Sequence, residues 1–168
     1  MHTRAIACGV ALIGALVLAA PAGADRPLKE PAPPLNETFP AGVVCPFQVT
    51  IETLVNNGFT ISFVDKDGNF RWQLGAGHLV VGITNDETGA SLVLNTTGPG
   101  KLFDNGDGTL TIVGGGHWTL LTFPGDVPPS TILYTSGRIE FTVDLATGRL
   151  VLVSLQGTSQ DLCEALEG

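Results

Sequence analysis

The chain has 168 residues, of which 43 % are hydrophobic and 22 are glycine, and its formal net charge is −8. This length corresponds to one domain with room for a buried core. Sixteen acidic residues against eight lysines and arginines make nucleic acid and anionic membranes poor partners, so neither is predicted.

The N-terminus has the three-part layout of a secretory signal. A short positive segment ends at Arg4, residues 5–20 are uncharged and mostly apolar, and Pro21–Ala24 places small residues at the −3 and −1 positions of a cleavage site. The apolar run is shorter than the roughly 20 residues that a membrane-spanning helix needs, which disfavours the alternative of a retained anchor. We expect cleavage after Ala24, no membrane span afterwards, and a secreted, extracellular protein.

Cysteine usage is consistent with export. Cys8 lies in the predicted signal, which leaves Cys45 and Cys163 and therefore one intramolecular pairing. Oxidising compartments preserve such bonds, so we predict a Cys45–Cys163 disulfide, with two free buried thiols as the alternative. The bond requires the two Cα atoms to lie within roughly 4.4–6.8 Å, which predicts that the segment before the first strand lies beside the C-terminal segment.

Residues 25–40, DRPLKEPAPPLNETFP, contain five prolines and no apolar periodicity. Such a composition predicts an extended, mobile tether rather than a packed element. The folded domain is then expected over residues 41–168. Two three-residue glycosylation patterns begin at Asn36 and Asn95, but such short patterns arise often by chance.

The rest of the chain alternates between apolar and polar residues in short runs separated by Gly, Asn and Asp turns. This pattern predicts an all-β fold, an antiparallel meander that closes into a barrel of roughly eight strands, with a sandwich as the alternative. A short C-terminal helix is expected, capped by Thr158, with Leu162 and Leu166 on one face. The expected strands lie near residues 47–51, 59–63, 70–74, 78–84, 91–95, 101–103, 109–113, 117–123, 131–144 and 149–155. Turns are predicted at residues 56–58 and 97–100 and a strand bend at residues 114–116. Residues 131–144 are expected as one long strand or as two strands joined at a bulge at Gly137.

A resemblance covers most of this domain. The segment GHLVVGITNDETGASLVLNTTGPGKLFDNGDGTLTIVGGGHW, at residues 77–118, is similar to small secreted bacterial proteins without an assigned function. The sequences PGDV at residues 124–127 and DLCEAL at residues 161–166 resemble the same group. The resemblance implies a barrel similar to those of allene oxide cyclase and dirigent proteins. No catalytic residue of those enzymes matches a position here, so none is carried over.

Three residues are candidates for catalysis. A single histidine can act as a general base, and His78 and His117 each begin a predicted strand directly after glycines. A hydrogen-bonded or surface histidine at a strand end is the alternative for both. Glu140 would act as a base if it faced an apolar interior, whereas an outward pair with Arg138 is the alternative. Two histidines without a spaced third ligand are a poor zinc signature, so no metal is predicted.

Aromatic residues supply the ligand-binding candidates Trp72, Trp118 and Tyr134. They would line an apolar cavity, although aromatic side chains more often fill the core. The acidic segments around Asp65 and Asp104 resemble fragments of calcium loops, but they lack the spacing of such loops and are better explained as hairpin turns. No cofactor is predicted.

Three hypotheses on function remain. The favoured one is a non-catalytic secreted barrel that binds an apolar small molecule or a surface component. An enzyme of the cyclase or isomerase type acting inside the barrel is the less favoured alternative, because no catalytic signature is present. The third is a structural or interaction module of the cell envelope.

Overall fold

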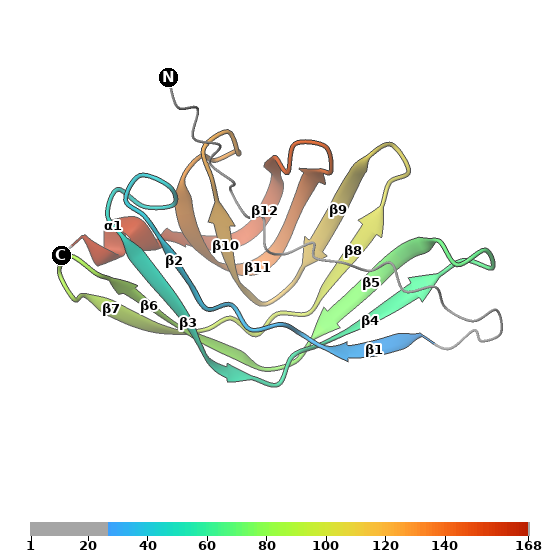
Figure 1. Cartoon of the computed structure of the whole chain (residues 1–168), viewed down its shortest axis with the longest axis horizontal. Helices are drawn as coiled ribbons and strands as arrows, with labels where there is room; N and C mark the ends of the chain where they lie inside the picture. Colours follow the sequence, from blue (N-terminus) through green and yellow to red (C-terminus); the bar gives the residue numbers. More distant parts are fainter. Residues whose placement is uncertain (1–26, 168) are drawn as a thin grey trace, which may run out of the picture.

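The computed structural model describes residues 27–167, and in this range the chain forms antiparallel strands and one short helix (Figure 1). The all-β class and the C-terminal helix are thus confirmed, whereas the predicted signal at residues 1–24 lies outside the described residues. The elements are β1 (Leu28–Pro31), β2 (Glu37–Phe39), β3 (Val49–Asn56), β4 (Phe59–Val64), β5 (Phe70–Ala76), β6 (Leu79–Asn85), β7 (Ser91–Asn95), β8 (Gly100–Asp104), β9 (Thr109–Gly114), β10 (His117–Thr122), β11 (Thr131–Asp144), β12 (Leu150–Asp161) and α1 (Leu162–Leu166).

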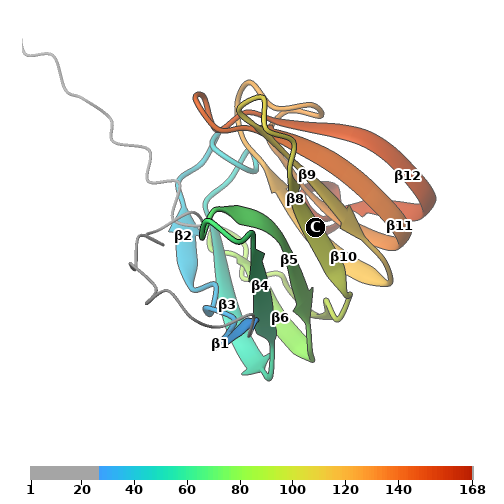
Figure 2. The same cartoon turned by 90° about the vertical axis from the view of Figure 1, so that its right-hand side faces the viewer.

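The strands form two sheets. The small sheet has the order β2-β3-β6-β7. The large sheet runs from β1 through β4, β5, β8 and β9 to β11, and β11 also pairs with β10 and β12 (Figure 2). Consecutive strands change sheets: β3 passes into β4, β5 into β6, and β7 into β8. The meander is therefore a set of long strands, most of which start in one sheet and end in the other.

The chain changes sheets at glycines. The predicted turns at residues 56–58 and 97–100 are such changes of sheet, so the chain bends there and does not reverse. The predicted strand bend at residues 114–116 is confirmed between β9 and β10. Of the two alternatives for residues 131–144, the structure has the single long strand, and the register of β11 with β12 shifts between Glu140 and Phe141 rather than at Gly137. Six glycines lie close to one another in pairs across neighbouring segments, and we call them the glycine line: Gly58 with Gly77, Gly98 with Gly116, and Gly137 with Gly157.

Neighbouring backbones approach closely along the glycine line. A Cβ atom on Gly77 would collide with the Asn57 carbonyl, and one on Gly137 would collide with the Gln156 carbonyl. Both glycines also have positive φ angles, 125° and 122°, which favour glycine over other residues. The close approach therefore requires glycine at positions 77 and 137.

Trp118 fills the hollow that the glycines leave. A Cβ on Gly98 would lie 2.5 Å from the indole Nε1 of Trp118, and Cβ atoms on Gly100 and Gly114 would also overlap the indole. The indole N–H donates to the carbonyl of Gly115 at 3.2 Å. Trp118 thus packs against backbone, as an aromatic residue that fills the core does, and its role in ligand binding stays a prediction.

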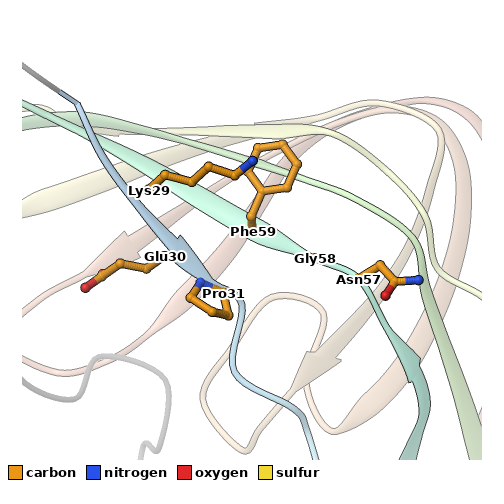
Figure 3. Close-up of a pocket in the computed structure, with 6 residues that line it drawn as sticks. All are labelled: Lys29, Glu30, Pro31, Asn57, Gly58 and Phe59. Carbon is orange, nitrogen blue, oxygen red and sulfur yellow. The ribbon is translucent and has the colours of Figure 1, made fainter.

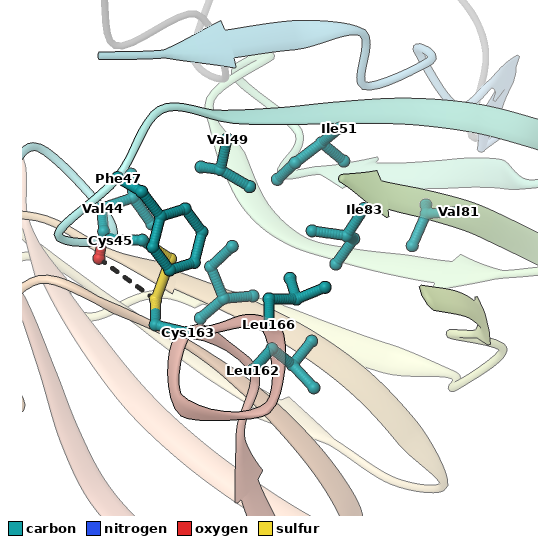
Figure 4. Close-up of a cluster of buried hydrophobic side chains, with 11 residues drawn as sticks. Val44, Cys45, Phe47, Val49, Ile51, Val81, Ile83, Leu162, Cys163 and Leu166 are labelled. Atoms are coloured by element: carbon teal, nitrogen blue, oxygen red, sulfur yellow. Dashed lines mark hydrogen bonds between the residues drawn. A yellow bond between two sulfur atoms is a disulfide. The ribbon is translucent and has the colours of Figure 1, made fainter. Parts of the chain in front are cut away.

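Two buried clusters lie on the two sides of this bend. The helix core lies between the small sheet, α1 and β11 (Figure 4). The sheet core lies on β9, β10 and β11 and is extended by half-buried side chains of β8 and β12. The helix core consists of Val44, Cys45, Phe47, Val49, Ile51, Val81, Ile83, Ile132, Leu162, Cys163 and Leu166, and the sheet core of Leu110, Ile112, Leu120, Ile139 and Phe141.

The predicted disulfide joins Cys45 to Cys163, with a Cα–Cα distance of 5.4 Å. It ties the segment before β3 to α1, as expected. Leu162 and Leu166 are buried on one face of the helix, which confirms their prediction. The cap, however, is Asp161, which accepts from the N–H of Cys163 at 2.8 Å, because Thr158 is part of β12.

The segment predicted as a mobile tether instead forms the edge strands β1 and β2. Residues 28–31 pair with β4 and residues 37–39 with β3. Proline is compatible with an edge strand, because its missing N–H is not needed on the outer side. Between the two strands, the side chain of Asn36 accepts from the N–H of Thr53 at 2.7 Å and the N–H of Leu35 donates to Thr53 Oγ1 at 2.8 Å.

Closure of the meander stays a prediction. Within residues 27–167, β1 is paired only with β4 and β12 only with β11, so no ladder joins the first strand to the last. Two sheets enclosing a core are equally consistent with a sandwich.

We predict that Gly100→Ala lowers the free energy of unfolding by about 1–3 kcal/mol, because its Cβ would overlap the indole of Trp118. Gly115→Ala is the matched control, since a Cβ there meets nothing within 4 Å. Denaturant unfolding followed by tryptophan fluorescence measures both. Equal free energies of unfolding for the two variants would contradict the close packing of the Trp118 indole against Gly100.

Candidate functional site

An apolar face lies on the outside of the hairpin β4–β5 and its neighbour β8. The register places Phe63 opposite Trp72 and Trp72 opposite Phe103. The adjacent row, Ser62, Gln73 and Leu102, points to the other side, where Leu102 packs against the sheet core. The rings therefore lie on the side of the large sheet that faces away from its core.

We call this surface the outer aromatic face. Phe63 and Trp72 stack with their ring centroids 3.7 Å apart and their planes 11° apart. Phe103 is 36 % exposed, and the other members are half-buried. Because contiguous exposed apolar surface is uncommon on monomeric proteins, this face is a candidate interaction surface. It consists of Phe59, Ile61, Phe63, Trp72, Leu74 and Phe103.

The opposite side of the same hairpin is polar. The side-chain amide of Gln73 donates to Ser62 Oγ at 2.9 Å. An alternating strand normally turns its apolar side to the core and its polar side to water. In β4 and β5 this arrangement is reversed, so packing among residues 27–167 does not explain why the outer side is aromatic.

Two lysines lie over these rings. Lys29 Nζ is 4.0 Å from the ring centroid of Phe59, and Lys101 Nζ is 5.6 Å from that of Trp72. Both separations fall within the range of cation–π attraction. The face thus presents positive charge on a chain whose net charge is −8.

An open depression of about 440 Å³ adjoins the face at β1 and the start of β4 (Figure 3). Lys29 crosses its rim with the ammonium group against the Phe59 ring. A second depression of about 160 Å³ lies over the glycine line and includes Gly58, Gly77 and Gly98 in its lining.

The two histidines differ in their surroundings. His78 is exposed, and its carbonyl accepts from the N–H of Asn57 at 2.8 Å. The ring of His117 stacks on Tyr134, with centroids 5.5 Å apart and planes 5° apart, and the Tyr134 hydroxyl donates to the carbonyl of Asn95 at 2.9 Å. The structure therefore brings two candidates, His117 and Tyr134, together.

Glu140 does not join this pair. It lies four residues beyond Ser136, the cross-strand partner of His117, which corresponds to about 13 Å along β11. Its carboxylate meets Arg138 at 3.5 Å, and both side chains are partly exposed. This geometry matches the outward pair that the sequence left as the alternative.

The acidic turns use their carboxylates within the turn. Asp65 Oδ1 accepts from the N–H groups of Asp67 and Asn69, both at 2.9 Å. Asp107 Oδ1 accepts from the N–H and the hydroxyl of Thr109, at 3.0 Å and 2.6 Å. Within residues 27–167 no three His, Cys, Asp or Glu residues gather in a group that could hold a metal ion. The hairpin-turn explanation fits both segments.

Comparison with known proteins adds no relative. No protein-family model matches the chain, and neither curated proteins nor solved structures give a match. The resemblance to allene oxide cyclase and dirigent-type barrels stays a prediction.

Sequence reasoning found Trp72 but not the face to which it belongs. The alternation in β4 and β5 shows that one side of the hairpin is apolar, and two sides are available. Only the register with Leu102, which packs against the sheet core, identifies the apolar side as the outer one. The contact of Lys29 with the Phe59 ring was not predicted, because the composition of residues 25–40 indicated a mobile tether.

We predict a loss of stability in acid that depends on three turn aspartates. Hydrogen bonds from Asn69, Thr109 and Thr147 hold the pKa values of Asp65, Asp107 and Asp144 below their ordinary value of 3.8. Since the folded pKa is the lower one, this stabilisation is present above pH 3.8 and is lost as the pH falls through the folded value. Denaturant midpoints measured from about pH 6 to about pH 2 test it. The denaturant midpoint of a variant with all three aspartates changed to asparagine should fall less steeply with decreasing pH. Equal slopes for this variant and the unchanged protein would contradict the assignment to these aspartates.

Proposed function

We infer that the protein is an exported, non-catalytic binding module that contacts its partner through the outer aromatic face. The observation that carries this proposal is the reversed polarity of β4 and β5, which leaves stacked Phe63 and Trp72 outside the core. The described part of the chain leaves this aromatic face uncovered, and a partner molecule that covers it would remove its apolar surface from water.

Export is supported by two features. The N-terminal sequence has the layout of a cleavable signal, and the Cys45–Cys163 bond is compatible with an oxidising exterior. Within residues 27–167, no helix is long and apolar enough to cross a membrane.

The partner is expected to be apolar and to carry negative charge. Lys29 and Lys101 place two ammonium groups over the rings, and the charge of the rest of the chain repels anions elsewhere on its surface. A small apolar anion or an anionic, partly apolar component of the cell envelope meets both conditions. The fold that presents the face is either a sandwich or an incompletely closed barrel.

A cyclase- or isomerase-type enzyme is the second candidate. It is favoured by His117 Nδ1 and Thr119 Oγ1, two buried polar atoms without a hydrogen-bond partner among the described residues. The two side chains share one side of β10, next to Tyr134.

Native mass spectrometry of protein from culture fluid separates the two candidates. The variant His117→Phe keeps an aromatic ring that can stack on Tyr134. If the enzyme alternative holds, this variant loses a co-purified molecule, whereas Trp72→Thr retains it. We predict the opposite result: Trp72→Thr loses the co-purified molecule and His117→Phe retains it, because we propose that the molecule binds the outer aromatic face.

The probe 8-anilinonaphthalene-1-sulfonate tests the aromatic face directly, because it joins an apolar ring system to an anionic group. We predict that the folded protein binds it and that Trp72→Thr/Phe103→Thr weakens binding roughly tenfold. Fluorescence titration gives the affinities.

The matched control is Leu54→Thr/Val93→Thr, which removes two exposed apolar side chains, 51 % and 69 % accessible, from strands of the small sheet. It should bind the probe like the unchanged protein. Absence of probe binding to the unchanged protein, or equal loss in both variants, would remove the aromatic face as the binding surface.

A further inference from the structure

Among residues 27–167, strand β12 has a long edge without a partner strand. Its ladder with β11 spans Leu133–Val143, while on the other side only Val127 meets it, through hydrogen bonds to Leu150 and Leu152 at 2.9 Å and 2.8 Å. From Val153 to Gln160, no other described residue bonds to the backbone on that side. Because backbone groups alternate in direction along a strand, every second residue there presents an unpaired N–H and C=O.

Nothing in the sequence of this edge protects it. Residues 153–160, VSLQGTSQ, contain neither a charge nor a proline, and residues 156–160 are all exposed. Natural monomers protect long edges with lysine, proline, bulges or a covering loop. Among the other outer strands of the large sheet, β1 has such protection, since it is four residues long and carries Lys29, Glu30 and Pro31.

We propose that β12 pairs with β12 of a second copy of this chain, antiparallel and around a two-fold axis, so that the two large sheets become continuous. A second copy is favoured because association of two acidic chains requires a surface without acid groups, and residues 153–160 provide one. The two copies supply identical strands, and antiparallel pairing about a two-fold axis is self-complementary.

The ends of the strand determine its direction. Arg149 precedes β12 and Asp161 closes it, with no ionisable residue between them. Antiparallel pairing turns the basic end of each copy toward the acidic end of the other, whereas parallel pairing would place like charges together. Two apolar side chains at the same edge, Val127 and Val153, are 42 % and 55 % exposed and would add apolar contact.

This interface is separate from the outer aromatic face. That face lies on β4, β5 and β8, and two strands of the large sheet, β9 and β11, stand between β8 and β12 in its pairing order. A dimer would thus present two aromatic faces, and either proposal can fail without the other.

Sedimentation velocity of residues 25–168, with the disulfide intact, tests the pairing. We expect a reversible dimer, and Gln156→Glu/Thr158→Glu should weaken it at least about tenfold, since the added charges face their own copies near the axis. The matched control, Ser91→Glu/Val93→Glu, adds the same charge with the same spacing on exposed positions of β7 and should dimerise like the unchanged protein.

Amide hydrogen exchange of the unchanged protein provides a readout that does not depend on a variant folding. Amides of residues 153–160 should exchange more slowly at high protein concentration than at low concentration, while those of β1 should not change. A monomer at every concentration, a dimer that both variants leave intact, or exchange at residues 153–160 that is independent of concentration would overturn the proposal.

Discussion

The fold depends on how closely neighbouring backbones approach along the glycine line. At Gly77 and Gly137 the adjoining carbonyl occupies the volume in which any Cβ would lie. This contact lets each strand bend sharply without losing its neighbour, so that one meander supplies both sheets. Trp118 then covers the bare backbone of Gly98, Gly100 and Gly114, and the helix core and the sheet core form on the two sides of the bend.

The reversed polarity of β4 and β5 follows from the same geometry. Past the bend, the inner side of this hairpin carries Ser62 and Gln73, and the Gln73 amide donates a hydrogen bond to Ser62 Oγ. Closing the sheet over them would remove a hydroxyl and an amide from water without burying apolar surface, which is unfavourable. The rings of Phe63 and Trp72 lie on the opposite side of the hairpin from Ser62 and Gln73, away from the sheet core.

The sequence pattern predicted the features that depend on residues close together in the chain or on residue type. The strands, the one long strand at residues 131–144, the buried face of the helix and the disulfide all follow from periodicity and cysteine chemistry. The errors concern long-range pairing. Asn56–Gly58 resembles a reversal, but β3 is already held by β6 and β4 by β5, so the chain must continue across the bend. Residues 28–31 lack periodicity because an edge strand with β4 on one side does not require it.

The candidate site was predictable only in part for the same reason. Trp72 stood out by residue type, and His117 by its position at a strand start. Which side of a strand faces the core depends on partners elsewhere in the chain, such as Leu102, and stacking of His117 on Tyr134 depends on the register of β10 with β11.

Because of the position of the disulfide, two parts of the molecule should differ in their sensitivity to reduction. Cys45 and Cys163 both belong to the helix core, and the remaining cysteine, Cys8, precedes the described residues. Reduction would therefore release α1 from the segment before β3, while the sheet core keeps its ladders. Because stability is distributed in cooperative units, a reducing environment would loosen the C-terminal helix and the small sheet first and leave the aromatic surface in place.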